Sequence, residues 1–292
     1  MNSCSLLHQE NLRKQAIEHP LVNDTVFPSL ESWVSHLIHQ KAYEEATRLV
    51  TGKAVLDLGC NVGYGMSIMA QTATSVAGLD ISPMSVEAAQ KRLGPGVDIR
   101  CYDGTQSTFA AHSFDVVTSF QVIEHISDYD AYLTEIARVL KPDGIAIFTT
   151  PNGRLRLDPG MKPWNPFHVR EFSHRDLEEL LAPRFGEVVV HGLFGGPEIS
   201  QIERNRYERA KQAVRRGSAP WRQAIRRGVL TAAPWIERRL AASRQQPANA
   251  GAALQKSEAA RFSTADLDYS TSDLANALEF MVIARRPNPL SS

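Results

Sequence analysis

Between residues 53 and 150, short apolar runs alternate with longer segments of helical periodicity. The apolar runs are rich in β-branched residues and show little polar alternation, which is typical of parallel strands covered by helices on both faces. The alternation therefore predicts βαβ units and an α/β fold. The five predicted strands lie at residues 53–59, 75–80, 97–103, 114–120 and 144–150.

The predicted helices have recognisable ends. Ser82 can cap a helix whose first turn contains Pro83, and Gly94 can close it. Residues 173–184 predict a later helix capped by Ser173. Two further strands are expected at residues 186–194 and 278–286.

The roughly eighty residues between those last two strands are too many for an ordinary loop and should contain structure of their own. We therefore predict three parts. They are an N-terminal helical cap at residues 1–50, a core formed by residues 51–197 plus 262–292, and a basic helical insertion at residues 198–261.

Charge is unevenly distributed, although the 292-residue chain contains 32 Lys and Arg against 32 Asp and Glu. Residues 201–261 hold fourteen Lys and Arg against four Glu, so this segment carries +10 and the remainder −10. Three interpretations of the insertion stay open: a solvated helical lid, a surface for an anionic substrate or a lipid membrane, and a nucleic-acid patch.

Cys4, Cys60 and Cys101 are far apart and lack metal-ligand spacing, which argues against a disulfide scaffold or a zinc site and favours a reducing compartment. No run approaches the length of a transmembrane helix, and the first residues lack the apolar region of a signal peptide. We therefore expect a cytoplasmic protein without a bound metal.

The most informative segment is residues 55–65, VLDLGCNVGYG, where a buried strand ends in a glycine-rich turn that opens a helix. Such a turn lets a ligand approach the backbone, but dinucleotide enzymes use one too. Asp57 precedes the glycines, where it can pair with a cationic group or a water beside it. The turn lacks the G-K-[ST] ending of a phosphate loop, which disfavours a triphosphate.

Two further carboxylates follow predicted strands. Asp80 ends the second strand, where it can accept hydrogen bonds from both hydroxyls of a ribose. Asp103 ends the third strand, where it can accept from the amine of adenine. A cationic group, a ribose and an adenine together describe S-adenosylmethionine.

Residues 50–195 resemble the class I S-adenosylmethionine-dependent methyltransferases, and within them the small-molecule type similar to the ubiquinone-biosynthesis and polysaccharide or natural-product enzymes. The resemblance rests on VLDLGCNVGYG, VAGLDIS, FDVVTSFQVIEHISD and RVLKPDGIAIFTTPN, in that order. It implies a Rossmann-like, seven-stranded, mostly parallel sheet with an antiparallel last strand and a helical insertion before it.

By this resemblance, the cofactor S-adenosylmethionine is bound by residues after the first four strands. Asparagine at position 61, where the family usually has glycine, tolerates a left-handed backbone better than most residues, so we expect binding to survive. The expected cofactor-binding residues are Asp57, Gly59, Cys60, Asn61, Gly63, Asp80, Ile81, Asp103, Gly104, Phe120 and Gln121.

His125 and His168 are the candidate catalytic residues, because an ordinary histidine pKa suits a general base at neutral pH. Glu171 lies three residues after His168 and can orient it if this segment is helical. A purely structural role stays open for both histidines. The other histidines, at positions 8, 19, 36, 39, 112, 174 and 191, are expected to be mostly surface or capping residues.

The proline-rich segment 150–172 follows the fifth strand and resembles a form common in polysaccharide and natural-product methyltransferases. Trp164, Asn165, Arg170 and Glu171 would then contact the acceptor, although such a loop can also serve only for packing. The sequence Ser-Phe-Gln-Val at 119–122 does not resemble the Asp/Asn-Pro-Pro-aromatic motif of enzymes that methylate base amines, which disfavours nucleic acid.

These observations predict an enzyme that transfers a methyl group by in-line displacement to a hydroxyl of a small or lipid- or sugar-linked metabolite. Two alternatives are N-methylation of a small molecule and a non-catalytic cofactor-binding module that acts through the basic insertion. The expected partner is a small-molecule acceptor rather than a nucleic acid, and peripheral membrane or lipid contact through residues 201–261 stays one of the open alternatives. The oligomeric state cannot be read from the sequence.

Overall fold

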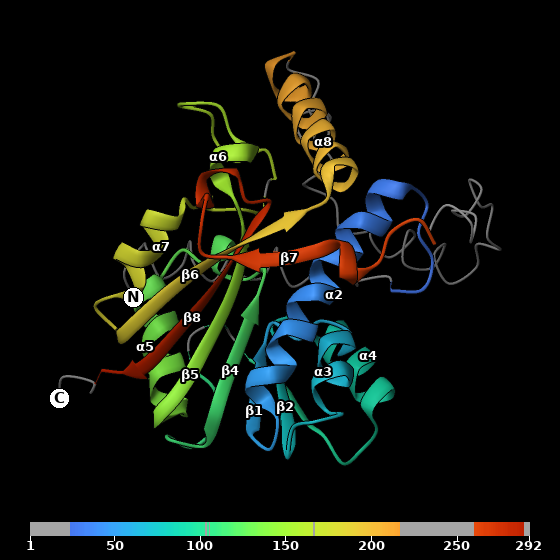
Figure 1. Cartoon of the computed structure of the whole chain (residues 1–292). Helices are drawn as coiled ribbons and strands as arrows, with labels where there is room; N and C mark the ends of the chain where they lie inside the picture. The colour runs from blue at the N-terminus through green and yellow to red at the C-terminus, as the bar shows by residue number, and fades with distance from the viewer. Residues whose placement is uncertain (1–23, 103, 105, 166, 217–259, 289–292) are drawn as a thin grey trace, which may run out of the picture.

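The computed structural model describes residues 24–102, 104, 106–165, 167–216 and 260–288. Its centre is an eight-stranded sheet with helices on both faces (Figure 1). The strands are β1 Ala54–Leu58, β2 Ser75–Asp80, β3 Asp98–Cys101, β4 Phe114–Phe120, β5 Leu140–Pro151, β6 Phe185–Gly195, β7 Leu267–Ser270 and β8 Glu279–Pro287. All seven predicted strands are present, and the α/β Rossmann-like fold class is confirmed.

The strand order is β3-β2-β1-β4-β5-β8-β6-β7. Strands β1 to β5 pair in parallel, whereas β8 is antiparallel to both β5 and β6. The chain winds outward from β1 to β3 and then returns to β4 on the other side of β1. The carboxyl ends of β1 and β4 therefore flank the point where the winding reverses, which is where ligands bind in open sheets of this kind.

One strand was not anticipated. β7 follows the insertion and pairs with β6 in an antiparallel ladder from Gly192↔Ser270 to Gly195↔Leu267. The expected sheet had seven strands, and β7 extends it to eight at the outer edge. β7 has only four residues and two of them are polar, so it offers little of the periodicity by which strands are recognised.

The helices begin and end where local chemistry predicts. Ser82 accepts a hydrogen bond from Ser85 N, Pro83 opens the helix, and Gly94 closes it with φ 83°. Ser173 forms a capping box with Asp176. The helices are α2 Leu30–Val50, α3 Tyr64–Met69, α4 Pro83–Leu93, α5 Tyr129–Val139, α6 Gly153–Arg156, α7 His174–Leu181 and α8 Pro197–Arg215, with short 3-10 turns η1 Ile123–His125, η3 Thr264–Asp266 and η4 Leu274–Asn276.

Side chains of the central strands alternate between the two faces of the sheet. Leu56 and Leu58 of β1 pack with α5 and α7, while Val55 packs with α2 and α3 on the opposite face. Because successive side chains of a strand point to opposite faces, Asp57 lies on the same face as Val55. Asp57 also pairs in register with Thr118 of β4. The alternation therefore places a carboxylate beneath α2.

Helix α2 crosses from the sheet to the start of the insertion (Figure 1). Its C-terminal half packs on β1 and β4, and its N-terminal half shares a cluster with Leu193, Ile199 and Leu267 of β6, α8 and β7. The predicted division into cap, core and insertion stays a prediction, and residues 217–259 of the insertion lie outside the described residues.

Two ion pairs join helix α8 of the insertion to acidic groups on neighbouring segments, and a third joins the two ends of the insertion to each other. The first two are Arg209 with Glu31 and Arg215 with Asp158, and the third is Arg261 with Glu198. Helix α8 therefore docks part of the insertion's positive charge on the body of the protein. Among the described residues, no helix is long and apolar enough to cross a membrane. The predicted contact with a lipid surface stays a prediction.

Candidate functional site

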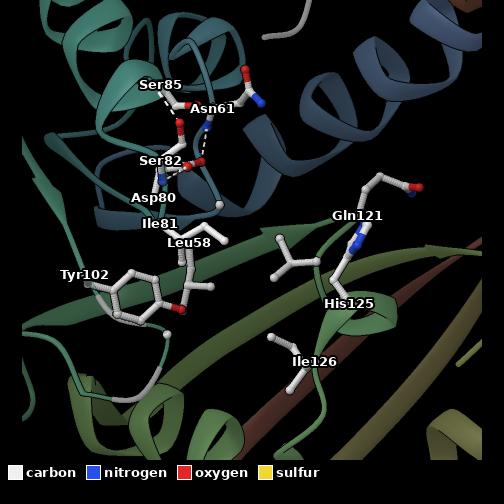
Figure 2. A pocket seen from close by; sticks show the side chains of 13 residues that line it. Leu58, Asn61, Asp80, Ile81, Ser82, Ser85, Tyr102, Gln121, His125 and Ile126 are labelled. Atoms are coloured by element: carbon white, nitrogen blue, oxygen red, sulfur yellow. Dashed lines mark hydrogen bonds between the residues drawn. The ribbon is translucent and has the colours of Figure 1, made fainter. Parts of the chain in front are cut away.

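A first hollow of about 640 Å³ opens at the carboxyl ends of β1 and β2 (Figure 2). The hollow is lined by Leu58, Gly59, Asn61, Asp80, Ile81, Ser82, Ser85, Tyr102, Gly104, Gln121, Val122, His125 and Ile126. Six of the expected cofactor-binding residues are in this lining: Gly59, Asn61, Asp80, Ile81, Gly104 and Gln121.

The glycine-rich turn after β1 is shaped by left-handed backbone angles. Gly59 has φ 88°, Asn61 has φ 44° and Gly63 has φ 72°. A Cβ on Gly59 would lie 2.4 Å from a methyl carbon of Val122. Position 59 therefore requires glycine both because of this collision and because of its left-handed backbone. Asn61 adopts the left-handed backbone that allows it to replace glycine. The turn can therefore keep its backbone open to a ligand despite this departure from the family pattern.

Asp80 lies across this turn and is held by backbone N–H groups. Its Oδ2 accepts from Asn61 N at 2.9 Å, and its Oδ1 accepts from Ser82 N at 2.8 Å (Figure 2). A carboxylate oxygen has lone pairs for more than one donor, so both oxygens can also accept from hydroxyl groups in the hollow. A fixed, nearly buried carboxylate is suited to hold the two hydroxyls of a ribose.

Apolar side chains form much of the lining of the first hollow. Leu58, Ile81, Tyr102 and Ile126 provide side chains that can cover a flat aromatic base (Figure 2). Gly104 is also in the lining, with φ 84°. Asp103, expected to accept from the adenine amine, lies outside the described residues. A carboxylate facing apolar walls matches the sugar and base of a nucleoside, so the residues present fit the adenosine part of S-adenosylmethionine.

Two expected cofactor residues line neither hollow of the site. Asp57 is buried beneath Tyr43, whose hydroxyl donates to Asp57 Oδ2 at 3.4 Å, while Thr118 donates to Oδ1 at 2.8 Å. Burial raises the pKa of Asp57 to about 7. Gly63 begins α3, and its missing Cβ makes room for Ala89 and Leu93 of α4. Direct cofactor contact by Asp57 and Gly63 stays a prediction.

A second hollow of about 950 Å³ adjoins the first. Gly59, Asn61, Gln121 and His125 line both. The second hollow is lined by His36, His39, Ala42, Tyr43, Gly59, Cys60, Asn61, Val62, Tyr64, Gly65, Phe120, Gln121, Glu124, His125, Thr149, Asn165 and His168. It contains the expected residues Cys60, Phe120, Asn165, His125 and His168.

Helix α2 contributes a wall that sequence reasoning missed. His36, His39 and Tyr43 line the second hollow, whereas the sequence assigned no role to His36 and His39. Their spacing of three and four residues places them on one helix face, which was the available signal. Burial lowers the pKa of His39 to about 4 and also lowers the pKa of His36, so both imidazoles are neutral at pH 7.

The aromatic rings of α2 and α3 are closely fitted. A Cβ on Gly65 would lie 1.9 Å from the ring of Tyr43, so only glycine allows this ring to rest on the start of α3. Tyr43 also packs edge-on against Tyr64 and at 4.7 Å from the ring centroid of Phe120. These three rings form one apolar side of the second hollow.

Gln121 stands at the junction of the two hollows in a left-handed conformation with φ 57°. Its Nε2 donates to Glu279 Oε2 at 2.8 Å, and Tyr269 donates to the other oxygen of Glu279 at 3.2 Å. Burial raises the pKa of Glu279 well above its usual range. The side-chain amide at the junction is thus oriented by a buried group from β8.

The two candidate catalytic histidines meet in the second hollow. Their rings pack edge to face with centroids 4.7 Å apart. His125 Nδ1 lies 3.0 Å from the carbonyl oxygen of Phe167, which can only accept, so this nitrogen carries the proton. His168 Nδ1 lies 3.0 Å from Glu171 Oε1. In each ring the other nitrogen, Nε2, is the one not engaged by these partners.

Glu124 lies beside the histidines with a carboxylate that is only partly satisfied. Thr150 donates to its Oε2 at 3.0 Å, whereas its buried Oε1 has no hydrogen-bond partner. Burial raises the pKa of this carboxyl. Within the described ranges, Glu124, His125 and His168 can offer ligand atoms within 4.8 Å of one another, so these three could hold a cation. The absence of a bound metal stays a prediction.

The four expected acceptor residues occupy different places. Asn165 lines the second hollow, and Glu171 lies behind His168. Trp164 instead covers the guanidinium of Arg156, whose central carbon is 4.2 Å from the ring centroid. Arg170 pairs with Asp176 near the surface. Trp164 and Arg170 are in the lining of neither hollow, so their contact with an acceptor stays a prediction.

Comparisons with known proteins agree with this site. A family model described as a methyltransferase domain matches residues 56–148. A probable S-adenosylmethionine-dependent methyltransferase of Mycolicibacterium smegmatis is 32% identical over 276 residues, which are 92% of this chain and 95% of that protein. A ubiquinone biosynthesis O-methyltransferase of Actinobacillus pleuropneumoniae is 34% identical over 36% of this chain and 48% of its own length.

Solved structures with low sequence identity share the fold. A possible histamine N-methyltransferase of Thermotoga maritima has a TM-score of 0.52 and 14% identity, covering 87% of this chain and 91% of that one. The cyclase SpnF has a TM-score of 0.53 and 19% identity, covering 98% and 96%. The full-length relative, the matching domain and the nucleoside-shaped hollow agree: the chain belongs to the S-adenosylmethionine-dependent methyltransferases, with S-adenosylmethionine as its cofactor.

Proposed function

We propose that this methyltransferase acts on a hydroxyl group of a small or lipid- or sugar-linked metabolite bound in the second hollow. The observation that carries the proposal is the junction of the two hollows at Gln121 and His125, with His168 also in the lining of the second. An acceptor in the second hollow would therefore adjoin the cofactor in the first, within reach of histidines that can accept a proton.

The charges around the second hollow disfavour an anionic acceptor. His36 and His39 are neutral at pH 7 because burial lowers the pKa of each. The described lining contains no lysine or arginine that could bind a phosphate or carboxylate on the acceptor. A hydroxyl compound is uncharged at pH 7, whereas most aliphatic amines arrive protonated and must first lose a proton before they can attack.

The lining also suits a ring that bears hydroxyl groups. Tyr43, Tyr64 and Phe120 offer aromatic surfaces on one side, while Gln121 and Asn165 offer polar groups. Sugars and phenols combine flat or apolar ring faces with hydroxyls at the edge, so they can use both kinds of contact. This composition favours a sugar-linked or aromatic hydroxyl compound as the ligand of the second hollow.

The cofactor supplies an electrophilic methyl group on a positively charged sulfur. His168 Nε2 would accept the hydroxyl proton as the oxygen forms its bond to the methyl carbon, and the electrons of the broken carbon–sulfur bond stay on sulfur. His125 would hold the acceptor beside His168. The aromatic wall of α2 and α3 would exclude water, which keeps the reacting groups close and poorly solvated.

The proposal is tested by incubating the full chain with S-adenosylmethionine and a panel of phenols, free sugars, glycolipids and small amines, and by following S-adenosylhomocysteine. We expect turnover with at least one hydroxyl compound and a product whose mass spectrum shows a methyl ether. Turnover restricted to amines, with an N-methyl product, would overturn the hydroxyl assignment. The name of the relative from A. pleuropneumoniae, an O-methyltransferase, supports the choice of oxygen.

A further inference from the structure

Three buried side chains form a continuous chain of contacts behind the second hollow. His168 Nδ1 lies 3.0 Å from Glu171 Oε1, and Arg156 Nε lies 2.7 Å from Glu171 Oε2. The side chains of His168, Glu171 and Arg156 are 6%, 0% and 5% exposed. Each oxygen of one carboxylate therefore faces a different nitrogen, and only His168 of the three lines the hollow.

The backbone fixes this arrangement. Residue 152 forms a parallel bridge with residue 172, and Gly153 N donates to the carbonyl of Phe172 at 2.8 Å. A Cβ on Gly153 would lie 3.0 Å from the carbonyl carbon of Glu171, so glycine lets α6 approach Glu171 without a shift of the backbone. Arg156 and Glu171 are thereby brought together from the two ends of a long loop.

The guanidinium of Arg156 is covered on the side away from His168. Its central carbon lies 4.2 Å from the ring centroid of Trp164 and 5.5 Å from that of Tyr207 on α8. Aromatic faces stabilise a cation that has been removed from water. Trp164, expected to contact the acceptor, thus contacts Arg156, and the first helix of the insertion contributes the second ring.

Glu171 remains a carboxylate despite its burial. Burial raises its pKa, but the hydrogen bond from His168 and the positive charge of Arg156 together lower it further, and the net pKa lies below the ordinary value. A buried ion pair is by itself a weak source of stability, because desolvation offsets much of the attraction between the charges. A purely structural role in holding the loop together would require only Arg156 and Glu171. Such a role does not explain why Glu171 also contacts His168, which lines the second hollow.

A carboxylate on one nitrogen of an imidazole determines what the other nitrogen can do. The carboxylate only accepts, so Nδ1 carries the proton and Nε2 keeps a lone pair. The charged and titratable groups that face His168 are Glu171, Glu124 and His125, with Arg156 behind Glu171. The direction of the Nε2 lone pair of His168 therefore depends on the buried ion pair between Glu171 and Arg156.

We propose that Arg156 and Glu171 are positioning residues that hold His168 with Nδ1 protonated and Nε2 open toward the acceptor. The catalytic meaning of this arrangement rests on the proposed function, in which Nε2 takes the hydroxyl proton. Glu171 also stabilises the imidazolium that forms when His168 accepts the proton. The positive charge of Arg156 limits this stabilisation, so the imidazolium can release its proton before the next turnover.

The test is nitrogen NMR of the full chain, labelled with ¹⁵N-histidine and bound to S-adenosylhomocysteine, with the His168 signals assigned by their loss in His168→Gln. We expect the neutral ring to be protonated on Nδ1. Glu171→Gln should raise the fraction of the ring protonated on Nε2 severalfold, because the carboxylate that accepts from Nδ1 is lost. Arg156→Gln should raise that fraction less, because Glu171 keeps its contact with Nδ1 and loses only the partner that fixes it.

The larger change in Glu171→Gln distinguishes positioning from a structural role, because a loosened loop would change the tautomer ratio equally in both variants. The matched control Glu178→Gln changes an exposed glutamate of α7 and should leave the His168 signals unchanged. A wild-type ring protonated on Nε2, equal changes of the tautomer ratio in both variants, or no change in either would overturn the proposal. None of these readouts uses an acceptor, so failure of the acceptor panel alone would overturn only the proposed function.

Discussion

The two hollows of this site are built in different ways. The first is lined mainly by the residues that directly follow β1, β2, β3 and β4, and its fixed carboxylate, Asp80, is held by backbone N–H groups. The second adds side chains from α2, α3 and the loop after β5, and two of its polar groups, Gln121 and His168, are held by other side chains. The cofactor side thus depends mainly on backbone, and the acceptor side depends more on contacts between side chains.

This difference has a physical consequence for substitution. A backbone N–H is present whatever the side chain, so the partners of Asp80 survive most changes at Asn61 or Ser82. Gln121 and His168 depend on Glu279 and Glu171, and a single change removes either partner. We therefore expect the first hollow to tolerate changes in its neighbours and the second to be sensitive to them.

The largest effect is expected from Asp80→Ala, which removes the carboxylate of the first hollow. Affinity for S-adenosylmethionine should fall by about 100-fold or more, because two hydrogen bonds to a charged acceptor are lost. Calorimetric titration measures this affinity, with Asp143→Ala, an exposed carboxylate, as the matched control. A decrease of less than threefold would show that Asp80 does not hold the ribose.

His168→Gln should impair catalysis in the second hollow and leave cofactor binding in the first hollow intact. We expect kcat to fall by about 100-fold, as is usual when a general base is removed, with cofactor affinity unchanged. The control is His112→Gln, whose ring contacts the carbonyl of Leu140 away from the site. If cofactor binding fell in parallel with kcat, the two hollows would not be independent.

Gly59→Ala tests whether backbone angles set the first hollow. The added Cβ would lie 2.4 Å from Val122, at a residue with φ 88°, so cofactor affinity should fall roughly tenfold. The double variant Gly59→Ala with Val122→Ala removes the collision but not the backbone strain, and should recover only part of the affinity. Full recovery would mean that the collision alone is responsible.

The smallest effect concerns stability and pH at Asp57. Its folded pKa of about 7 lies above the ordinary value of 3.8, so its contribution to stability is fully present below 3.8 and is lost as pH rises through 7. Asp57→Asn should therefore stabilise the cofactor-free protein at pH 8 by roughly 1–3 kcal/mol, and by less at pH 5. Thermal unfolding at both pH values measures this difference, and a gain that is equal at both would contradict it.

The sequence was informative where function depends on consecutive residues. The turn around Gly59 and the position of Asp80 follow from strand ends and glycine spacing, and both lie in one hollow. The burial of Asp57 under Tyr43 was not foreseeable, because it requires α2 to cross the sheet at that point. Spacing alone could not show which face of α2 meets the site.

The contact between His168 and Glu171 shows the same limit within one short segment. Their separation of three residues indicated a contact, on the condition that the segment formed a helix. The segment is not helical, and the contact instead arises because the bridge between residues 152 and 172 closes the loop. The sequence thus indicated the correct contact between His168 and Glu171 for a wrong geometric reason, and it gave no sign that Arg156 joins them.

Helix α2 reaches the acceptor hollow with His36, His39 and Tyr43, while its last turn, at Val50, is anchored in the core just before β1. Because these side chains project from one continuous helix, changes at three positions would remodel the acceptor wall and leave the glycine turn and Asp80 in place. Related enzymes could therefore diverge in the compounds they recognise by substitutions along this single helix, while retaining a common way of holding the methyl donor.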